Sequence, residues 1–118
     1  MVGARLNLVV LYSADIEQAV RFYETLGLSF VRHRHGSGPE HYASEVDSVV
    51  FEIYPTTDST QSGVLRIGFA VEDIHAAVER LREMGICVIS GPKSSPWGLR
   101  AIVTDFDGNR VELLGVGH

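Results

Sequence analysis

Two glutamates stand in apolar runs where a carboxylate could do chemistry: Glu52 in "FEIYP" and Glu112 in "VELLG". Each alternates with large apolar residues, and this spacing alone favours a glutamate that faces solvent from a half-buried strand. The same strand faces also carry Val50, Tyr54 and Leu114, however, and such a mixed surface suits the wall of a cavity. Within a cavity, one of the two glutamates could serve as a general acid or base.

Arg66 is the candidate partner for these carboxylates. An arginine at the start of a strand is usually an exposed surface residue. Placed in a cavity beside Glu112, and near Glu52, its fixed positive charge would hold the carboxylates ionised without a metal. It could equally hold an anionic group of a ligand. On both readings Arg66 is a candidate binding residue.

Trp97 is the only tryptophan of the chain and stands in "SSPWGLR". Its ring either packs against the edge of a sheet or offers a stacking surface for a flat aromatic ligand. In the second case Tyr42, Tyr54 and Phe69 are candidates to help bind the ligand.

Three histidines flank the loop "HGSGPEHY", and two of them, His33 and His35, share one strand face. A separate metal site formed with His41 is one reading. The alternative, which we favour, is that His41 and its neighbours make polar contacts at the mouth of a cavity, because no further ligand has a telling spacing.

An internal repeat supplies the elements that would position these residues. "SADIEQAVRFYETLGLSF" (13–30) returns as "VEDIHAAVERLREMGICV" (71–88) at a constant offset of 58 residues. Both copies have apolar residues at helical spacing. Asp15 and Asp73 are predicted N-caps, and Gly27 and Gly85 suit the left-handed position that ends a helix.

Strand-like runs surround each helix, and the pattern predicts strand, helix and three strands, twice. The runs are 6–13, 28–34, 42–46 and 49–54 in the first copy, and 64–71, 86–90, 99–104 and 110–115 in the second. A loop, "PKSSPWG", precedes the last pair of strands. The predicted fold is α+β: two tandem βαβββ units, about 5–55 and 64–115, joined by loop 56–63, forming a paired, curved mixed sheet with a central cleft.

Composition narrows the class of protein. A chain of 118 residues with 45% hydrophobic content can form one domain, whereas each half alone would bury too little surface. A net charge of −5 gives no basic stripe, so we expect neither nucleic acid nor membrane as a partner. One cysteine excludes an internal disulfide, and run 6–12 is too short to span a bilayer. We expect a cytoplasmic protein.

The doubled unit, with "FYETLG" in the first copy and "DGNRVEL" in the second, resembles the vicinal oxygen chelate (VOC) superfamily of glyoxalases, bleomycin-resistance proteins and extradiol dioxygenases. The resemblance covers nearly the whole chain. It implies a divalent metal held by a histidine on each unit's first strand and a glutamate on its last strand, with open positions for two substrate oxygens. It also implies a homodimer.

The chain keeps half of that ligand set. Glu52 and Glu112 match the family's glutamates, but Leu8 and Arg66 stand seven residues before the caps, where the histidines belong, and neither can bind a metal. Asn7 could supply an oxygen only if the strand register slipped by one. We therefore expect no metal or other cofactor. The alternative is a divalent cation such as Mg²⁺ on the two carboxylates.

The expected function is metal-independent binding or sequestration of a small molecule, aromatic or anionic, as in bleomycin-resistance proteins. The alternative is an enzyme, either a divalent-metal-dependent glyoxalase-like lyase or isomerase, or a dioxygenase-type enzyme. A third reading is a partner domain whose cleft is vestigial. The fold alone does not distinguish these three functions, because one fold can carry many of them. The geometry of the site must distinguish them.

Overall fold

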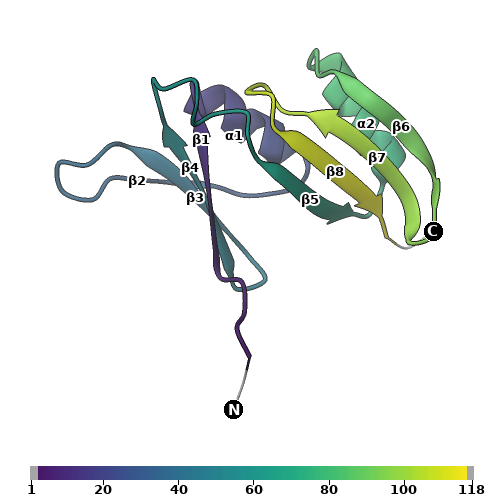
Figure 1. Cartoon of the computed structure of the whole chain (residues 1–118), viewed down its shortest axis with the longest axis horizontal. Coiled ribbons are helices and arrows are strands. Elements are labelled where there is room, and N and C mark those ends of the chain that lie inside the picture. The colour runs from purple at the N-terminus through teal and green to yellow at the C-terminus, as the bar shows by residue number, and fades with distance from the viewer. Residues whose placement is uncertain (1–2, 117–118) are drawn as a thin grey trace.

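The computed structural model describes residues 3–116 and contains two βαβββ units in tandem (Figure 1). The first consists of β1 (Leu8–Ser13), α1 (Ile16–Thr25), β2 (Val31–His33), β3 (His41–Val46) and β4 (Val49–Pro55). The second consists of β5 (Arg66–Val71), α2 (Ile74–Glu83), β6 (Val88–Ser95), β7 (Gly98–Thr104) and β8 (Arg110–Gly115). The predicted α+β class and the two tandem units are confirmed. In the described part of the chain, no helix has the length and apolar character needed to cross a membrane.

Each unit builds its own four-stranded mixed sheet. The strand orders are β1-β4-β3-β2 and β5-β8-β7-β6, with β1 parallel to β4, β5 parallel to β8, and the other pairs antiparallel. Figure 1 shows the two sheets side by side and not closed over each other. Each sheet therefore keeps one face free of helices, and a cleft between the two units is not enclosed by a single chain.

Local signals set the helix ends as the sequence predicted. Asp15 Oδ1 accepts a hydrogen bond from the Gln18 amide at 3.1 Å, and Asp73 Oδ1 accepts one from the Ala76 amide at 3.0 Å. Beyond each helix a glycine has the positive φ expected of a left-handed stop, +107° at Gly27. The two helices thus begin and end at equivalent positions of the repeat.

Strand β6 is longer than predicted, since it continues to Ser95 through most of the expected "PKSSPWG" loop. Its pairing with β7 shifts register twice, between Val88 and Ser90 and between Ser90 and Lys93. Bulges at an edge strand accommodate a proline without breaking the sheet, which explains how Pro92 lies inside a strand.

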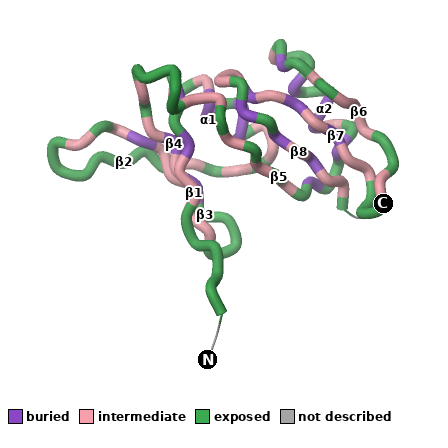
Figure 2. The backbone as a smooth tube through the Cα atoms, in the orientation of Figure 1, coloured by how far each residue is buried: buried purple, intermediate pink, exposed green. Residues whose placement is uncertain are grey.

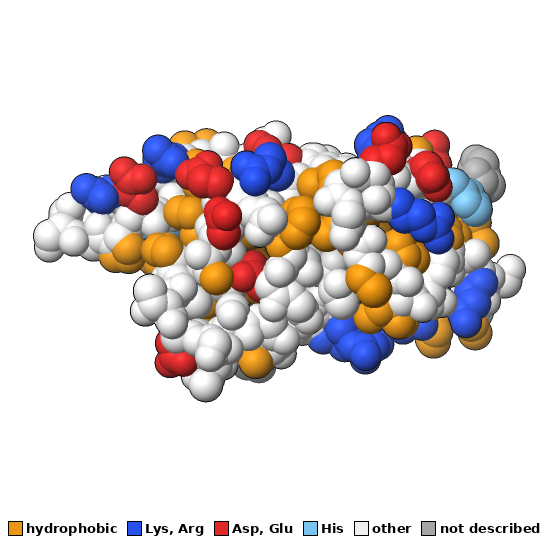
Figure 3. All heavy atoms as spheres, turned by 90° about the horizontal axis from the view of Figure 1, so that it is seen from above, with side chains coloured by type: hydrophobic (Ala, Val, Ile, Leu, Met, Phe, Trp, Pro, Cys, Tyr) orange, Lys and Arg blue, Asp and Glu red, His pale blue; other side chains and the backbone are white. Residues whose placement is uncertain are grey.

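The hydrophobic core lies between the helices and one face of each sheet. Along the strands, buried positions alternate with half-buried or exposed ones (Figure 2). Fully buried residues include Phe22 and Tyr23 from α1, Leu81 from α2, Ile53 from β4 and Leu113 from β8. Seen from above, acidic and basic side chains are intermixed along one long edge of the molecule (Figure 3).

The turn between β7 and β8 joins the two units. Its buried Asp105 accepts a 2.6 Å hydrogen bond from the hydroxyl of Tyr23 in α1. Its Asp107 accepts hydrogen bonds from Ser13 Oγ at 2.7 Å and from the Ala14 amide at 2.9 Å. We call these five residues the inter-unit clamp. Burial, and then the charge of Asp105, raise the pKa of Tyr23 well above its ordinary value, so the hydroxyl stays protonated and donates.

The connecting loop meets the same turn. The Leu65 amide donates to Asn109 Oδ1 at 2.8 Å. Gly63 has φ +75°, and a Cβ there would lie 2.4 Å from the carbonyl oxygen of Asp107. Only glycine fits at this position, because any side chain would collide with the backbone of the turn.

Candidate functional site

The helix-free face of the second sheet holds a largely apolar cavity of about 590 Å³. It is lined by Gly68, Phe69, Ala70, Trp97, Arg100, Glu112, Leu113 and Leu114. Strands β5, β7 and β8 supply its floor, and the β6–β7 turn supplies Trp97. A concave apolar surface with a few converging polar groups is the usual form of a small-molecule site.

The charged residues that line this cavity are Arg100 and Glu112, and Glu112 also pairs with Arg66, which lies outside the lining. Arg66 Nε donates to Glu112 Oε2 at 2.7 Å, and Arg100 donates to Glu112 Oε1 through Nε at 2.8 Å and through Nη2. The hydrogen bonds from Arg66, and then from Arg100, hold the pKa of Glu112 below its ordinary value. Glu112 is therefore an ionised, doubly paired carboxylate, which makes it a weak base.

Arg100 was not among the residues that the sequence singled out. In the β7–β8 register Ile102 lies opposite Glu112, and Arg100 lies opposite Leu114. Since Ala101 and Val103 are buried on the helix side, Arg100 must share the face of Glu112. The alternation of side chains in "RAIVT" indicates which face of the strand Arg100 lies on. Only the β7–β8 register shows that Arg100 meets Glu112.

Trp97 is held by its turn and exposes its ring. The Trp97 amide donates to Ser95 Oγ at 3.2 Å, and Ser95 Oγ donates to the Gly98 carbonyl at 2.6 Å. The residue is 75% exposed. Of the two readings of Trp97, the structure favours an available ring over one packed against the sheet edge.

Glu52 lies on the helix-free face of the first sheet, among histidines. Its Oε2 is 3.5 Å from Nε2 of the buried His41, whose ring stacks on Tyr54 with centroids 4.2 Å apart. The rings of His33 and His35 are 5.9 and 5.3 Å from the ring of His41. A second, smaller cavity of about 340 Å³ is lined in part by Glu52, His33 and His35.

The two glutamates therefore line different cavities. Arg66 pairs with Glu112 as expected, whereas Glu52 belongs to the other sheet and meets His41 instead. Their side chains are 20% and 28% exposed, so neither simply faces bulk water. Leu8, at the position equivalent to Arg66, is an exposed residue of β1 opposite Val50.

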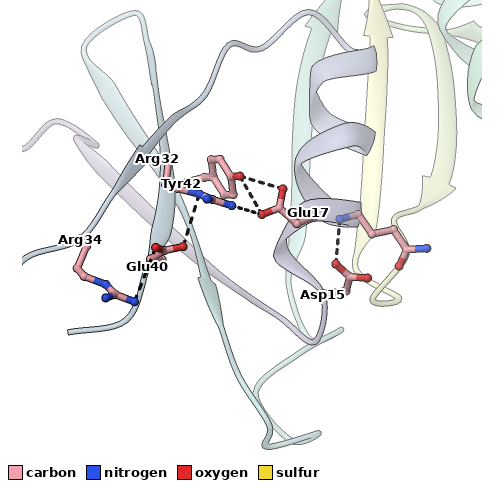
Figure 4. Close-up of polar contacts among 7 residues, drawn as sticks. Asp15, Glu17, Arg32, Arg34, Glu40 and Tyr42 are labelled. Atoms are coloured by element: carbon pink, nitrogen blue, oxygen red, sulfur yellow. Dashed lines mark hydrogen bonds and ion pairs between the residues drawn. The ribbon is translucent and has the colours of Figure 1, made fainter. Parts of the chain in front are cut away.

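Two predicted ligand-binding residues have their partners on the helix side. The Tyr42 hydroxyl donates to both oxygens of Glu17 in α1 at 2.9 Å, and Arg32 lies over its ring (Figure 4). Tyr42 lies opposite Ile53, a core residue, so it faces away from Glu52. Phe69 contributes to the cavity lining, but its ring packs toward Tyr23 in the core, with centroids 5.8 Å apart.

The donor set does not fit the divalent metal that the resemblance implies. Leu8 has no donor atom, and both oxygens of Glu112 are taken by guanidinium groups. Among residues 3–116, no group of three or more His, Cys, Asp or Glu is placed to hold a metal ion.

Solved structures share this architecture. TnmS3, an antibiotic binding protein from Streptomyces sp. CB03234, is 28% identical, with a TM-score of 0.74 over 98% of both chains. A glyoxalase/bleomycin resistance protein from the same organism is also 28% identical, with a TM-score of 0.69 over 93% of this chain and 99% of that one.

Sequence comparison gives the same assignment. An uncharacterized protein of Mycolicibacterium smegmatis is 30% identical over 104 residues, which cover 87% of this chain and 86% of the relative. The family model described as Glyoxalase/Bleomycin resistance protein/Dioxygenase superfamily matches residues 5–113. The doubled βαβββ unit and these matches agree, and the chain belongs to the Glyoxalase/Bleomycin resistance protein/Dioxygenase superfamily.

Proposed function

We propose that this protein binds a flat aromatic small molecule in the cavity of about 590 Å³ beside Trp97, and that it acts by sequestration without transforming the ligand. The observation that carries the proposal is the pairing of Glu112 with Arg66 and Arg100. This pairing compensates the charge of the ionised Glu112, which stands where an enzyme would need a metal ligand or a base. An exposed tryptophan and an apolar floor remain, and these serve binding.

The similarity to TnmS3, an antibiotic binding protein, supports the same class of function. The enzyme alternatives are weaker on this geometry. A metal-dependent lyase or dioxygenase needs donors that Leu8 and Arg66 do not offer. Metal-free acid–base chemistry on Glu112 is disfavoured because two arginines lower its pKa.

Binding can be tested with the single tryptophan as the probe. We expect planar fused-ring compounds, such as phenazine-2-carboxamide, to raise the thermal unfolding temperature and to quench Trp97 fluorescence saturably. In contrast, Mg²⁺, Mn²⁺, Ni²⁺ and Zn²⁺ should give no stabilisation. Trp97→Ala should weaken binding about tenfold by calorimetry, because the stacking contact is lost, and Trp97→Tyr should restore most of it.

The panel decides between the classes of function. Stabilisation by a divalent ion with none by any planar compound would overturn the proposal. So would chemical conversion of a bound probe, followed by mass spectrometry. Equal affinity of wild type and Trp97→Ala would contradict stacking on Trp97 and would count against the proposed site.

We further propose that two copies pair through their helix-free sheet faces. The face of the first sheet carries Glu45 and Glu52, and that of the second carries Arg110 outside the cavity lining. Contacts between Arg110 and these glutamates would join opposite charges and leave Arg66 and Arg100 available to the ligand. A second copy would cover the exposed cavity wall. Light scattering after gel filtration should give twice the 12.9 kDa chain mass, and Arg110→Glu should shift the equilibrium toward monomer. A wild-type monomer at 100 µM would contradict this arrangement.

A further inference from the structure

Resting on the proposed function, we infer that the ligand of this cavity is an aromatic anion: a flat ring system that carries one carboxylate or one ionised hydroxyl, held by Arg66 and Arg100. A neutral aromatic compound would use only the apolar part of the site.

The group formed by Arg66, Arg100 and Glu112 is positively charged. Glu112 is ionised and cancels one of the two guanidinium charges, so the three side chains retain a net positive charge. Arg110 lies directly opposite Arg66 in the β5–β8 register and adds a further positive charge to this face. In the right half of Figure 3, which contains the second sheet, Lys and Arg side chains lie along the lower edge, opposite the edge where charges of both signs are intermixed. An anion would find an uncompensated positive field there.

The same group keeps hydrogen-bond donors for a ligand. Arg66 uses only Nε for Glu112, and within residues 3–116 its two Nη groups have no hydrogen-bond partner. Its side chain is 56% exposed, so a ligand can reach these groups. Arg100 likewise keeps Nη1 free among the described residues. A guanidinium presents paired N–H groups that match the two oxygens of a carboxylate.

The charged group lies beside the stacking ring. Arg100 and Glu112 line the same cavity as Trp97, so the positive group and the stacking ring belong to one site. The duplicated unit gives an internal contrast, because Leu8 stands where the second unit has Arg66, and Glu52 meets His41 rather than an arginine. The cationic group is therefore a property of the second unit alone and not of the fold.

The test compares two probes of nearly the same size and shape by calorimetry at pH 7.5: phenazine-2-carboxylate, which is an anion with two acceptor oxygens, and phenazine-2-carboxamide, which is neutral and has an NH2 donor in place of one of them. We expect the carboxylate to bind wild type about tenfold more tightly, and the ratio to shrink between 50 and 500 mM salt because the arginines are partly exposed. In Arg66→Gln the ratio should fall to about one, whereas Arg66→Lys should keep part of it. Arg80→Gln, the same charge change on the exposed side of α2, should leave the ratio unchanged.

The outcomes separate this inference from the proposal on which it rests. Equal affinities for the two probes in wild type, or an undiminished ratio in Arg66→Gln, would overturn the anionic ligand and leave aromatic binding intact. Failure of both probes to bind or to quench Trp97 would count against the aromatic site itself.

Discussion

Replacing Gly68 by isoleucine is expected to weaken ligand binding by about a hundredfold or more and to raise the stability of the fold at the same time. Gly68 is exposed in the middle of β5 and forms part of the cavity floor. It has no positive φ, and an added Cβ would meet only the Glu112 carbonyl oxygen at 3.7 Å and its Cβ at 3.8 Å. These are ordinary contacts, so neither backbone nor packing requires glycine.

Glycine inside a strand costs stability, and it often marks a place where another group comes close to the backbone. A β-branched side chain at Gly68 should therefore stabilise the strand by about 0.5–1 kcal/mol while filling the floor of the cavity. The equivalent position of the first unit, Val10, shows that the fold accepts such a residue there.

A series of substitutions of increasing size at Gly68 tests this prediction. Affinity for phenazine-2-carboxylate should fall stepwise through Gly68→Ala, Gly68→Val and Gly68→Ile, while the midpoint of urea unfolding rises or stays level. Parallel losses of affinity and stability would mean that Gly68 serves the fold instead. Unchanged affinity in Gly68→Ile would place the ligand elsewhere.

Asp105→Ala is expected to be the most destabilising single substitution considered for this chain, at about 3 kcal/mol. The carboxylate is 4% exposed and accepts hydrogen bonds from the Tyr23 hydroxyl, from the Asn109 amide and side chain, and from the Asp107 amide. Removing it leaves several buried donors without a partner, and each such group costs about 1–3 kcal/mol.

Urea unfolding followed by circular dichroism measures this loss. Tyr23→Phe, which removes only one donor to Asp105, should cost less, about 1 kcal/mol. Glu83→Ala, at the exposed end of α2, should stay within about 0.5 kcal/mol of wild type. A loss below 1 kcal/mol for Asp105→Ala would show that the inter-unit clamp contributes little to stability.

The parts of the fold that could be predicted depend on neighbours in the sequence. Asp15 and Asp73 stand immediately before the helices that they cap, and Gly27 lies two residues after the end of α1, so periodicity and composition were enough. The end of β6 was not predictable in this way. Pro92 and the serines after it read as a loop, and only pairing with β7 through two bulges keeps them in a strand.

The site was predictable only in part, because strand faces are set by register and the arrangement of the two sheets is not local. Arg66 and Glu112 meet as expected, since parallel neighbours β5 and β8 follow from the unit itself. Tyr42 turns to the helix side because its register places it opposite Ile53, which no spacing within "EHYAS" reveals. Likewise, nothing near Glu52 or Glu112 shows that they lie on sheets that do not close over each other.

The inter-unit clamp makes the two copies of the repeat non-interchangeable. The turn that holds α1 lies in the second unit and spans residues 105–109, whereas the first unit joins β3 to β4 through only Asp47 and Ser48, both with positive φ. That short turn offers no carboxylate pair to reach a neighbouring helix. A gene fusion of two first units would keep the strand and helix pattern yet lose the hydrogen bonds that join the halves, so the two similar units have different structural roles.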